Sequence, residues 1–402
     1  MRPDFQSCGP AASGPLDTAE VAIVGAGLAG ASAAWFLAPQ YDVVLVEQAE
    51  QAAAEASGQN AGMLRRLVAD PVDRALACRS LEYFRDLPGG DWPESPVRWT
   101  GGLCASTGPM PALDRAAEDL RRRGIPVERL TAAQVSKRLP AAAGIQLEAG
   151  WFVPEDGTAD PWTLARGFLN GARRRGARLH LNSATHRLCL DGHRVVGVET
   201  SRGRIDASQV VIAAGAWSRA LGRRFGRPQP VQPYARHLLH SAPHPLAGPQ
   251  DPWFWIEDAG LYLRPESGGW LCSPCDGDPA EPPPGAGSLL PVEPEGLTLL
   301  ADKLSRVLPE VAQMRIRGGW RGLRSFAPDR RPIIGPDPEV SGLWWAVGLG
   351  GSGVTCSFAV GDLLRARFEG QDPPWIDAAA LDPGRPDLAP PPAKETPSPL
   401  SR

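Results

Sequence analysis

Residues 25–30, with the sequence G-A-G-L-A-G, have the spacing of a turn that binds the phosphates of a dinucleotide. Gly25 permits the tight turn, Gly27 lets the backbone approach a pyrophosphate, and Gly30 lets a helix and a strand pack closely. The free amides at the start of the following helix, Ala29 among them, supply positive potential for phosphate groups. The motif therefore predicts binding of a phosphate-linked cofactor.

An acidic residue stands at the distance expected for recognition of a ribose. Glu47 lies twenty residues after Gly27 and is followed by Gln48. A carboxylate there can accept hydrogen bonds from ribose hydroxyls, and it disfavours the 2′-phosphate of NADP. Together with the glycine turn, Glu47 predicts dinucleotide binding.

Three further segments favour FAD over a nicotinamide cofactor. They are S-G-Q-N-A-G-M at 57–63, A-A-G-A-W at 213–217 and G-L-G-G-S-G-V-T at 348–355. A single nicotinamide site does not need a second glycine-rich turn hundreds of residues later, whereas a bulky flavin gripped from several parts of the chain does. The predicted cofactor contacts beyond the first turn are Ser57, Gly58, Asn60, Ala61, Gly62, Met63, Ala184, Ala214, Gly215, Gly350, Gly351, Ser352, Gly353, Val354 and Thr355.

The elements around these motifs read as an α/β fold. A β-branched strand at 20–24, an alanine-rich helix at 29–38 and a strand at 41–46 form a βαβ unit. Asp160 and Pro161 open a helix that ends near Gly176. Short strands are predicted at 178–181, 187–190, 195–199, 209–212 and 343–347, and a last helix runs to about 367.

Two segments do not continue this pattern and predict a second domain. The FAD-binding domain is expected at 18–91, 148–230 and 315–370, and the substrate domain at 92–147 and 231–314. Residues 1–17 and most of 371–402 are expected to be disordered tails, and 279–294 a surface loop. Both domains are therefore discontinuous in sequence.

Composition excludes several classes of function. The 402 residues carry a net charge of −3, which implies no strong field for nucleic acid. No apolar run approaches the ~20 residues needed to span a bilayer, and no export signal is visible, so a cytoplasmic location without an integral membrane segment is expected. Cys272 and Cys275 form one C-x-x-C; without a second ligand pair it is read as two buried thiols, and no metal site is predicted.

The order of these motifs resembles the D-amino-acid oxidase / glycine oxidase superfamily of FAD enzymes. The resemblance extends from Ala19 to Arg367, and Y-L-R-P-E-S-G-G, W-R-G-L-R-S-F-A-P-D and W-A-V-G-L-G-G-S-G look most like D-arginine dehydrogenase and its relatives. It implies a Rossmann FAD domain with a second domain built on a mixed β-sheet. It also implies noncovalent FAD, because Gly322 replaces the cysteine that tethers the flavin in the sarcosine oxidase branch.

The same resemblance suggests the substrate site. It places Arg324 and Tyr262 on the substrate carboxylate, Arg236 elsewhere in the pocket, and Glu94 at an acid that faces a cationic side chain in D-arginine dehydrogenase. Met63 and Leu64 replace a histidine and a tyrosine there, which predicts a more apolar cavity. Tyr262 also replaces a lysine that promotes reaction with oxygen in the sarcosine oxidase branch, which leans towards a dehydrogenase.

The expected reaction is oxidation of an amino acid, with a D-amino acid favoured, by hydride transfer to flavin N5 and hydrolysis of the imino acid. Alternatives are glycine or a secondary amino acid as substrate, or a flavin-carrying subunit of a larger oxidoreductase. The electron acceptor is open between a quinone, a carrier and O₂. No catalytic side chain is obligatory; His237, His240 and His244 are read as exposed, and Trp253 and Trp255 as core residues or, alternatively, an aromatic wall near the flavin.

Overall fold

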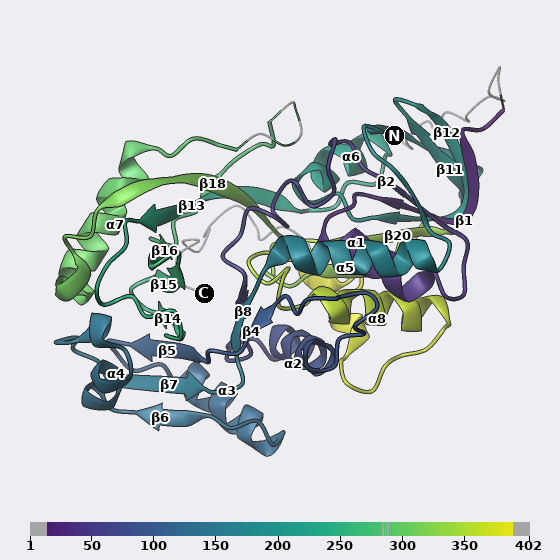
Figure 1. Ribbon diagram of the computed structural model, residues 1–402. Coiled ribbons are helices and arrows are strands. Elements are labelled where there is room, and N and C mark those ends of the chain that lie inside the picture. Colours follow the sequence, from purple (N-terminus) through teal and green to yellow (C-terminus); the bar gives the residue numbers. More distant parts are fainter. Residues whose placement is uncertain (1–13, 284, 286, 288, 389–402) are drawn as a thin grey trace.

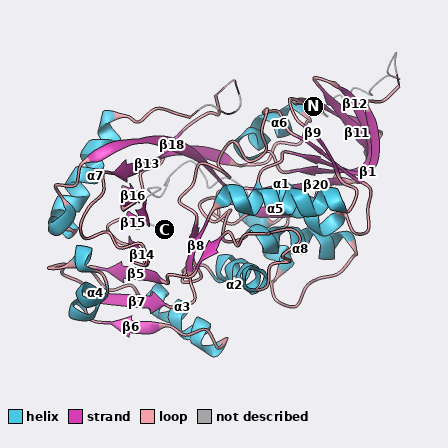
Figure 2. Cartoon of the chain, in the orientation of Figure 1, coloured by secondary structure: helices cyan, strands magenta, loops and turns pink. Residues whose placement is uncertain are grey.

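The computed structural model describes residues 14–283, 285, 287 and 289–388, arranged as two units side by side (Figure 1). One unit is a sheet covered by helices, and the other is a curved sheet flanked by helices (Figure 2). The α/β class predicted from the sequence is confirmed.

The first unit is built on a sheet with parallel strands at its centre. β1 (Asp17–Val24) lies between β2 (Val43–Val46) and β12 (Gly203–Ile212), and β9 (Arg178–His180) and β20 (Leu343–Val347) extend the sheet in parallel on its two sides. β10 (Thr185–Asp191), β11 (Arg194–Thr200) and β19 (Ile333–Pro336) are antiparallel additions.

Three helices cover one face of this sheet. α1 (Leu28–Leu37) packs against α5 (Pro161–Arg174) and α8 (Ser357–Phe368). α1 is buried along almost its whole length, which explains its alanine-rich sequence: small side chains let two helices and a sheet approach it together. Asp160 caps α5 by accepting a hydrogen bond from the Thr163 amide at 2.6 Å. The predicted helices and strands of this unit are all present.

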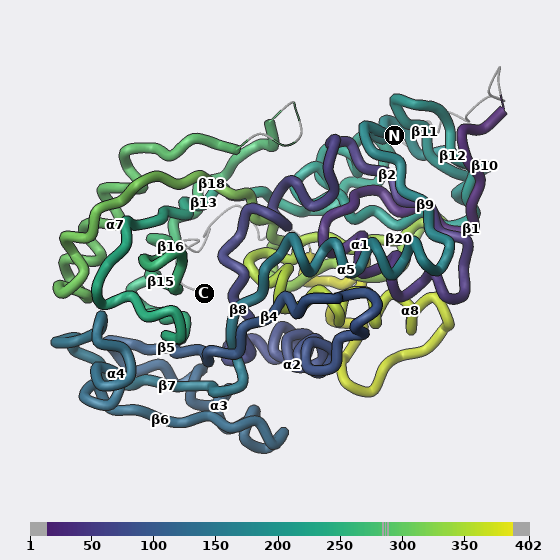
Figure 3. The backbone as a smooth tube through the Cα atoms, in the orientation of Figure 1, coloured from purple at the N-terminus to yellow at the C-terminus, as the bar shows by residue number. Residues whose placement is uncertain are grey.

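The second unit contains a mixed sheet, as the family resemblance implied, and this sheet has nine strands. Its strands are β5 (Gly102–Ser106), β6 (Glu128–Leu130), β7 (Ala149–Val153), β13 (Gln232–Ser241), β14 (Trp253–Ile256), β15 (Leu261–Glu266), β16 (Gly269–Ser273), β17 (Asp278–Pro279) and β18 (Ile316–Phe326). β14 and β5 pair in parallel, and the other pairs are antiparallel. β13 and β18 run side by side over ten paired positions, although they are far apart in the chain (Figure 3).

The remaining helices belong to the edges of the two units. α3 (Pro111–Arg122), α4 (Ala132–Arg138) and α7 (Pro294–Val307) pack on the mixed sheet, whereas α2 (Pro71–Arg85) packs against α8. α6 (Ser218–Arg224) follows β12.

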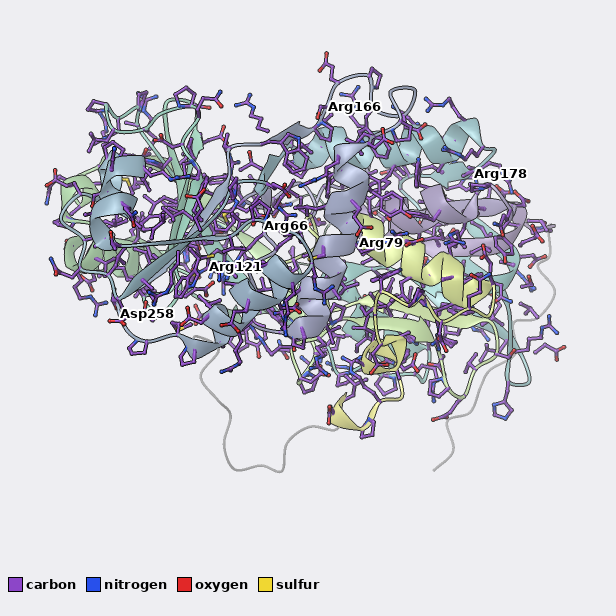
Figure 4. The ribbon with its side chains drawn as sticks, turned by 90° about the horizontal axis from the view of Figure 1, so that it is seen from below. Arg66, Arg79, Arg121, Arg166, Arg178 and Asp258 are labelled. Atoms are coloured by element: carbon purple, nitrogen blue, oxygen red, sulfur yellow. The ribbon has the colours of Figure 1, made fainter. Side chains whose placement is uncertain are left out.

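A small sheet and a buried ion pair join the two units. The sheet contains β3 (Met63–Leu64), β4 (Val97–Arg98) and β8 (Gly157–Ala159). Just after β3, the Arg66 guanidinium donates to Asp156 with an Nε–Oδ1 distance of 2.8 Å, and both side chains are buried. Figure 4 shows Arg66 near the middle of the molecule, whereas Arg178 lies towards one end.

The predicted domain boundaries need three corrections. β7 and β18 belong to the mixed sheet and not to the FAD-binding unit, because each pairs with strands of the second unit along its length. Asp17 already lies in β1. Residues 371–388 are packed and not a disordered tail: Leu381 is fully buried, and Arg385 pairs with Asp329 at 2.7 Å.

The predicted loop at 279–294 is partly correct. Pro279 ends β17, Leu290 forms a single bridge with Arg321, and Pro294 begins α7. Residues 284, 286 and 288, like the predicted tail segments 1–13 and 389–402, lie outside the described residues.

Candidate active site

One large cavity, of about 1420 Å³, is lined by residues of both units. The turns after β1, β2, β12 and β20 reach it from the first unit, and β13, β14 and β18 reach it from the second. The carboxyl ends of the parallel strands therefore open into the cavity, which is where ligands bind in sheets of this type.

The first glycine turn is packed too closely for side chains. A Cβ on Gly30 would lie 1.9 Å from the Gly25 carbonyl oxygen, and a Cβ on Gly25 would lie 2.5 Å from the Ala213 carbonyl oxygen. Gly25 also has a φ of +103°, which favours glycine. The backbone after β1 consequently borders the cavity directly, at the N-terminus of α1.

Glu47 is held rigidly at the end of β2. Its Oε2 accepts a hydrogen bond from the Ala26 amide at 2.8 Å, and its Oε1 accepts one from the Ala49 amide at 2.9 Å. Glu47 and Gln48 both line the cavity. Each carboxylate oxygen has a second lone pair, so Glu47 keeps the capacity to accept ribose hydroxyls.

Most of the predicted cofactor residues meet at this cavity, and two do not. Gly30 and Gly58 do not line it. Gly30 packs against the Gly25 backbone, and Gly58 packs against Trp162, whose ring would lie 2.6 Å from an added Cβ. The lining residues are Gly25, Gly27, Ala29, Glu47, Gln48, Ser57, Asn60, Ala61, Gly62, Met63, Ala184, Ala214, Gly215, Gly350, Gly351, Ser352, Gly353, Val354 and Thr355.

The shape and the donors of the cavity fit FAD. Gly62, Gly215 and Gly350 have φ values of +63°, +51° and +56°, so three further turns present backbone to the same space as the first one. The last turn leads into α8, as predicted. Backbone amides beside several turns, an acid fixed at the ribose position and a cavity spanning both units suit an adenine dinucleotide with a bulky second ring.

Arg324 and Tyr262 are brought together, but only Arg324 reaches the cavity. The Arg324 Nη2 atom donates a hydrogen bond to the Tyr262 hydroxyl at 3.2 Å. Tyr262 is fully buried, does not line the cavity, and packs against Trp255 with ring centroids 4.8 Å apart. Burial raises the pKa of the Tyr262 hydroxyl. The expected direct contact of Tyr262 with substrate is therefore corrected: Trp255 covers the ring, and Tyr262 orients Arg324 from behind.

Arg236 lines the cavity as well. Its Nε donates to the backbone carbonyl oxygen of Asp276 at 2.7 Å. Burial, with a smaller contribution from the charge on Arg324, lowers the pKa of Arg236. The structure thus brings two guanidinium groups, from β13 and β18, to the same cavity.

The prediction for Glu94 is wrong. Glu94 is exposed, lies in the loop before β4 and does not line the cavity. Its loop is anchored elsewhere, because Trp92 is buried and donates to the Leu164 carbonyl oxygen at 3.2 Å, while Asp91 accepts a hydrogen bond from Trp35 at 2.7 Å. These anchors hold the segment against α1 and α5.

The histidine prediction also needs correction. His237 is not exposed: it lies on β13, is 2% exposed and is hydrogen-bonded to Asp276 through Nδ1 at 2.6 Å. His240 and His244 are partly buried. His237 and His240 lie within β13, which is paired on both sides in the mixed sheet, whereas the proline-rich pattern had suggested exposure.

Sequence reasoning missed an ion pair in the cavity wall. Arg65 pairs with Glu257, and its guanidinium lies 4.5 Å from the Trp255 ring. No local pattern links positions so far apart in sequence. Trp253 is core, as favoured, whereas Trp255 lines the cavity and fits the alternative of an aromatic wall.

The two thiols of the C-x-x-C motif are buried, as expected. Cys272 donates a hydrogen bond to the Leu239 carbonyl oxygen at 3.1 Å, and burial raises its pKa to about 12. Within the described ranges there is no group of three or more His, Cys, Asp or Glu side chains placed to hold a metal ion. None of the helices in the described residues combines the length and apolar character needed to cross a membrane.

A sheet of this topology with several turns closing on one cavity defines a class, the flavin-dependent oxidoreductases that bind FAD through a Rossmann unit. Comparison with protein families identifies the chain within that class. It belongs to the FAD dependent oxidoreductase (DAO) family, whose model matches residues 20–367.

Three relatives illustrate the range within the family. The chain is 26% identical to 4-methylaminobutanoate oxidase (formaldehyde-forming) of Paenarthrobacter nicotinovorans, covering 92% of this chain and 46% of that protein. It is 29% identical to D-amino acid dehydrogenase of Cereibacter sphaeroides (67% and 61%) and to glycine oxidase of Geobacillus kaustophilus (86% and 91%). The crystal structure of the latter covers 92% of this chain with a TM-score of 0.78. The chain spans about half the length of the first of these relatives.

Proposed function

We propose that the chain uses FAD to oxidise the carbon–nitrogen bond of an α-amino acid, with a D-amino acid as the preferred substrate. The observation that carries this proposal is the Arg324 guanidinium, which lines the same cavity as the glycine turns and is oriented by the Tyr262 hydroxyl at 3.2 Å. A guanidinium can bind a carboxylate through two parallel hydrogen bonds, which fixes the direction of the rest of the substrate.

In this reaction the residues of the chain bind and orient the substrate, and the cofactor carries out the oxidation. When bound, FAD supplies the two-electron oxidant. Arg324 binds the carboxylate, and Trp255 and Met63 provide an apolar wall that orients the rest of the substrate. The reactive amine is neutral, so its lone pair forms the C=N bond as the α-hydrogen leaves with its electron pair. The remaining N–H proton passes to solvent, and water then converts the imino acid to a 2-oxo acid and ammonia.

The FAD is held without a covalent bond in this proposal. Gly322 lines the cavity on β18 and has no side chain to attach. An added Cβ would lie 2.8 Å from the Gln59 carbonyl oxygen, so a larger residue would also not fit without movement. The flavin should therefore separate from the denatured polypeptide.

Glycine or a secondary amino acid is the second candidate substrate class. Glycine oxidase of Geobacillus kaustophilus matches over 91% of its own length, which supports this alternative. A D-amino acid and the second class both carry a carboxylate and an amine on one carbon. Glycine lacks a side chain on that carbon, and a secondary amino acid carries an additional alkyl group on its nitrogen.

Anaerobic mixing of the purified chain with a panel of D-, L- and N-alkyl amino acids tests the proposal. We expect D-amino acids to bleach the flavin absorbance fastest. Faster bleaching by glycine or sarcosine would select the second candidate. Bleaching by none of the panel, while dithionite still reduces the flavin, would contradict both and favour a flavin-carrying subunit.

A further inference from the structure

Arg236 and Arg324 lie on one face of two paired strands. In the register of β13 and β18, Arg236 is opposite Gly322 and Tyr234 is opposite Arg324. Residues two apart on a strand share a face, so Arg324 is the diagonal neighbour of Arg236. Gly322, directly opposite Arg236, leaves that part of the wall without a side chain. Both arginines line the cavity.

Neither guanidinium is neutralised by a carboxylate of the described residues. In the part of the chain that the structure describes, no carboxylate oxygen lies within the 4.0 Å limit of an ion pair with either of them. Arg324 donates to a hydroxyl and Arg236 donates to a backbone carbonyl. Two other arginines of the same cavity differ: Arg65 pairs with Glu257, and Arg331 pairs with Asp70.

The Asp276 carboxylate, the candidate partner for Arg236, is already hydrogen-bonded to His237. The Asp276 carboxylate accepts hydrogen bonds from the His237 amide at 3.0 Å and from His237 Nδ1 at 2.6 Å. The Glu293 amide donates to His237 Nε2 at 3.0 Å, so it is His237 Nδ1 that donates to Asp276. Burial alone would raise the pKa of Asp276, but these bonds from His237 lower it. Asp276 therefore stays charged and bound to His237, and offers Arg236 only its backbone oxygen.

A third cation, Lys303, lies near Arg236, whose positive charge acts on it. The Lys303 ammonium group donates to the carbonyl oxygens of Gly260 and Pro274 at 2.8 and 2.7 Å, and burial lowers its pKa. Buried cations are costly unless an anion joins them. One carboxylate brings one negative charge, which neutralises only one of the two arginines facing the cavity.

We propose that the substrate carries a second carboxylate and that Arg236 binds it, while Arg324 binds the carboxylate next to the amine. This inference rests on the proposed function and names its substrate class: an amino acid or secondary amine with two carboxylates. His237 and Asp276 act as positioning residues, because the Asp276 backbone oxygen holds Arg236 Nε and leaves its two terminal nitrogens for the ligand.

Matched substrate pairs test the proposal directly. D-glutamate and D-glutamine, or D-aspartate and D-asparagine, differ only in replacing the second carboxylate by a carboxamide. Sites built to hydrogen-bond a polar group of the substrate reject analogues that lack it by about 10⁴-fold or more, and a carboxamide, which keeps one oxygen acceptor, should be rejected less strongly. We expect anaerobic bleaching of the intact flavoprotein to be at least 50-fold more efficient, in kcat/KM, with the dicarboxylate of each pair.

The Arg236→Met variant separates the two roles. It should reduce the preference to less than 5-fold through a loss of kcat/KM that is far larger for the dicarboxylate than for the carboxamide, and Arg236→Lys should be intermediate. An equal loss for both members of each pair would mean that the two arginines share one carboxylate, and would overturn the proposal. A wild-type preference for the carboxamides would overturn it too.

A ligand titration on the wild-type protein keeps the test independent of folding of the variants. Succinate should perturb the flavin spectrum at concentrations at least tenfold lower than butyrate, which has one carboxylate; equal affinities would contradict the second site. If no amino acid bleaches the flavin but succinate still binds more tightly, the proposed function fails while the two-anion pocket stands.

Discussion

The cofactor turns and the arginine pair border one cavity, but they obtain their charge in different ways. At the turns, the positive potential comes from backbone amides, and the glycines serve to bring that backbone close. At the other region, Arg236 and Arg324 bring full charges on side chains from strands that are distant in sequence. A cofactor held by backbone is insensitive to most substitutions, whereas substrate recognition by two side chains can be changed at a single position.

The largest effect should come from the cofactor region. Gly30→Ala places a Cβ 1.9 Å from the Gly25 carbonyl oxygen, so the turn and α1 must separate. We expect a loss of stability of about 3–5 kcal/mol and of most bound FAD. Unfolding by urea and the ratio of flavin to protein absorbance measure the two effects. Gly89→Ala, where nothing lies within 4 Å of the added Cβ, is the control; equal flavin content in both variants would refute the close-packing account.

The next largest effect should come from the buried Arg66–Asp156 ion pair, which joins the two units. Asp156→Asn leaves the buried Arg66 guanidinium with only Glu155, at 3.4 Å, as a charged partner, and the loss of its buried carboxylate partner should cost about 3 kcal/mol. Denaturant unfolding should show this loss. Because the pair lies between the units, we expect both flavin content and substrate affinity to fall. A variant with unchanged stability would show that the pair does not hold the units together.

A smaller effect should appear as a pH dependence at the cavity wall. Burial, reinforced by the neighbouring Asp70, raises the pKa of the Asp73 carboxyl to about 7. Between pH 4 and pH 7 the folded chain keeps a proton that the unfolded chain releases, so the contribution of Asp73 to stability falls as the pH rises through this range. Because Asp73 also borders the cavity, solvent screens its charge. We therefore expect the free energy of unfolding to fall by about 2 kcal/mol, which is less than a fully buried carboxyl with this pKa would give.

Asp73→Asn should remove this dependence. Urea unfolding at pH 5 and pH 8 should show a variant that gains stability relative to wild type at the higher pH. Parallel pH profiles for the two proteins would mean that Asp73 does not carry the proton.

The smallest effect should come from Tyr262. Tyr262→Phe removes the acceptor of the Arg324 hydrogen bond but keeps the ring under Trp255. A lost hydrogen bond of this kind is worth about 1 kcal/mol, so KM should rise about fivefold with kcat and FAD content unchanged. Glu94→Gln, on the exposed loop, should leave KM within twofold. A Tyr262→Phe loss of 100-fold would instead indicate direct contact with substrate.

Local signals explain why the cofactor region was predictable. The 25–30 turn, Glu47 after a strand, and the 348–355 turn before a helix each reveal their role within a few residues. Gly58 was misplaced because a glycine needed for packing against Trp162 looks the same in sequence as one needed for a ligand.

The substrate region depends on strand pairing that no local pattern contains. Arg236 meets Arg324 only because β13 and β18 pair in one register, and His237 is buried because its strand lies inside the sheet. Resemblance to relatives predicted Arg324, which lines the cavity, and Glu94, which lies away from it because its loop is anchored on α5 by Trp92. Tyr262 was found, although its place behind Trp255 depends on side-chain packing.

The central claim is that cofactor binding and substrate binding are separable within the one cavity. Arg324→Met tests it, by measuring in a single preparation the FAD content and the dissociation constant of the substrate that bleaches the flavin. We predict unchanged FAD content and a dissociation constant raised about 100-fold or more, as expected for loss of a bidentate carboxylate contact. Parallel loss of FAD and of substrate binding, or substrate affinity equal to that of wild type, would contradict it.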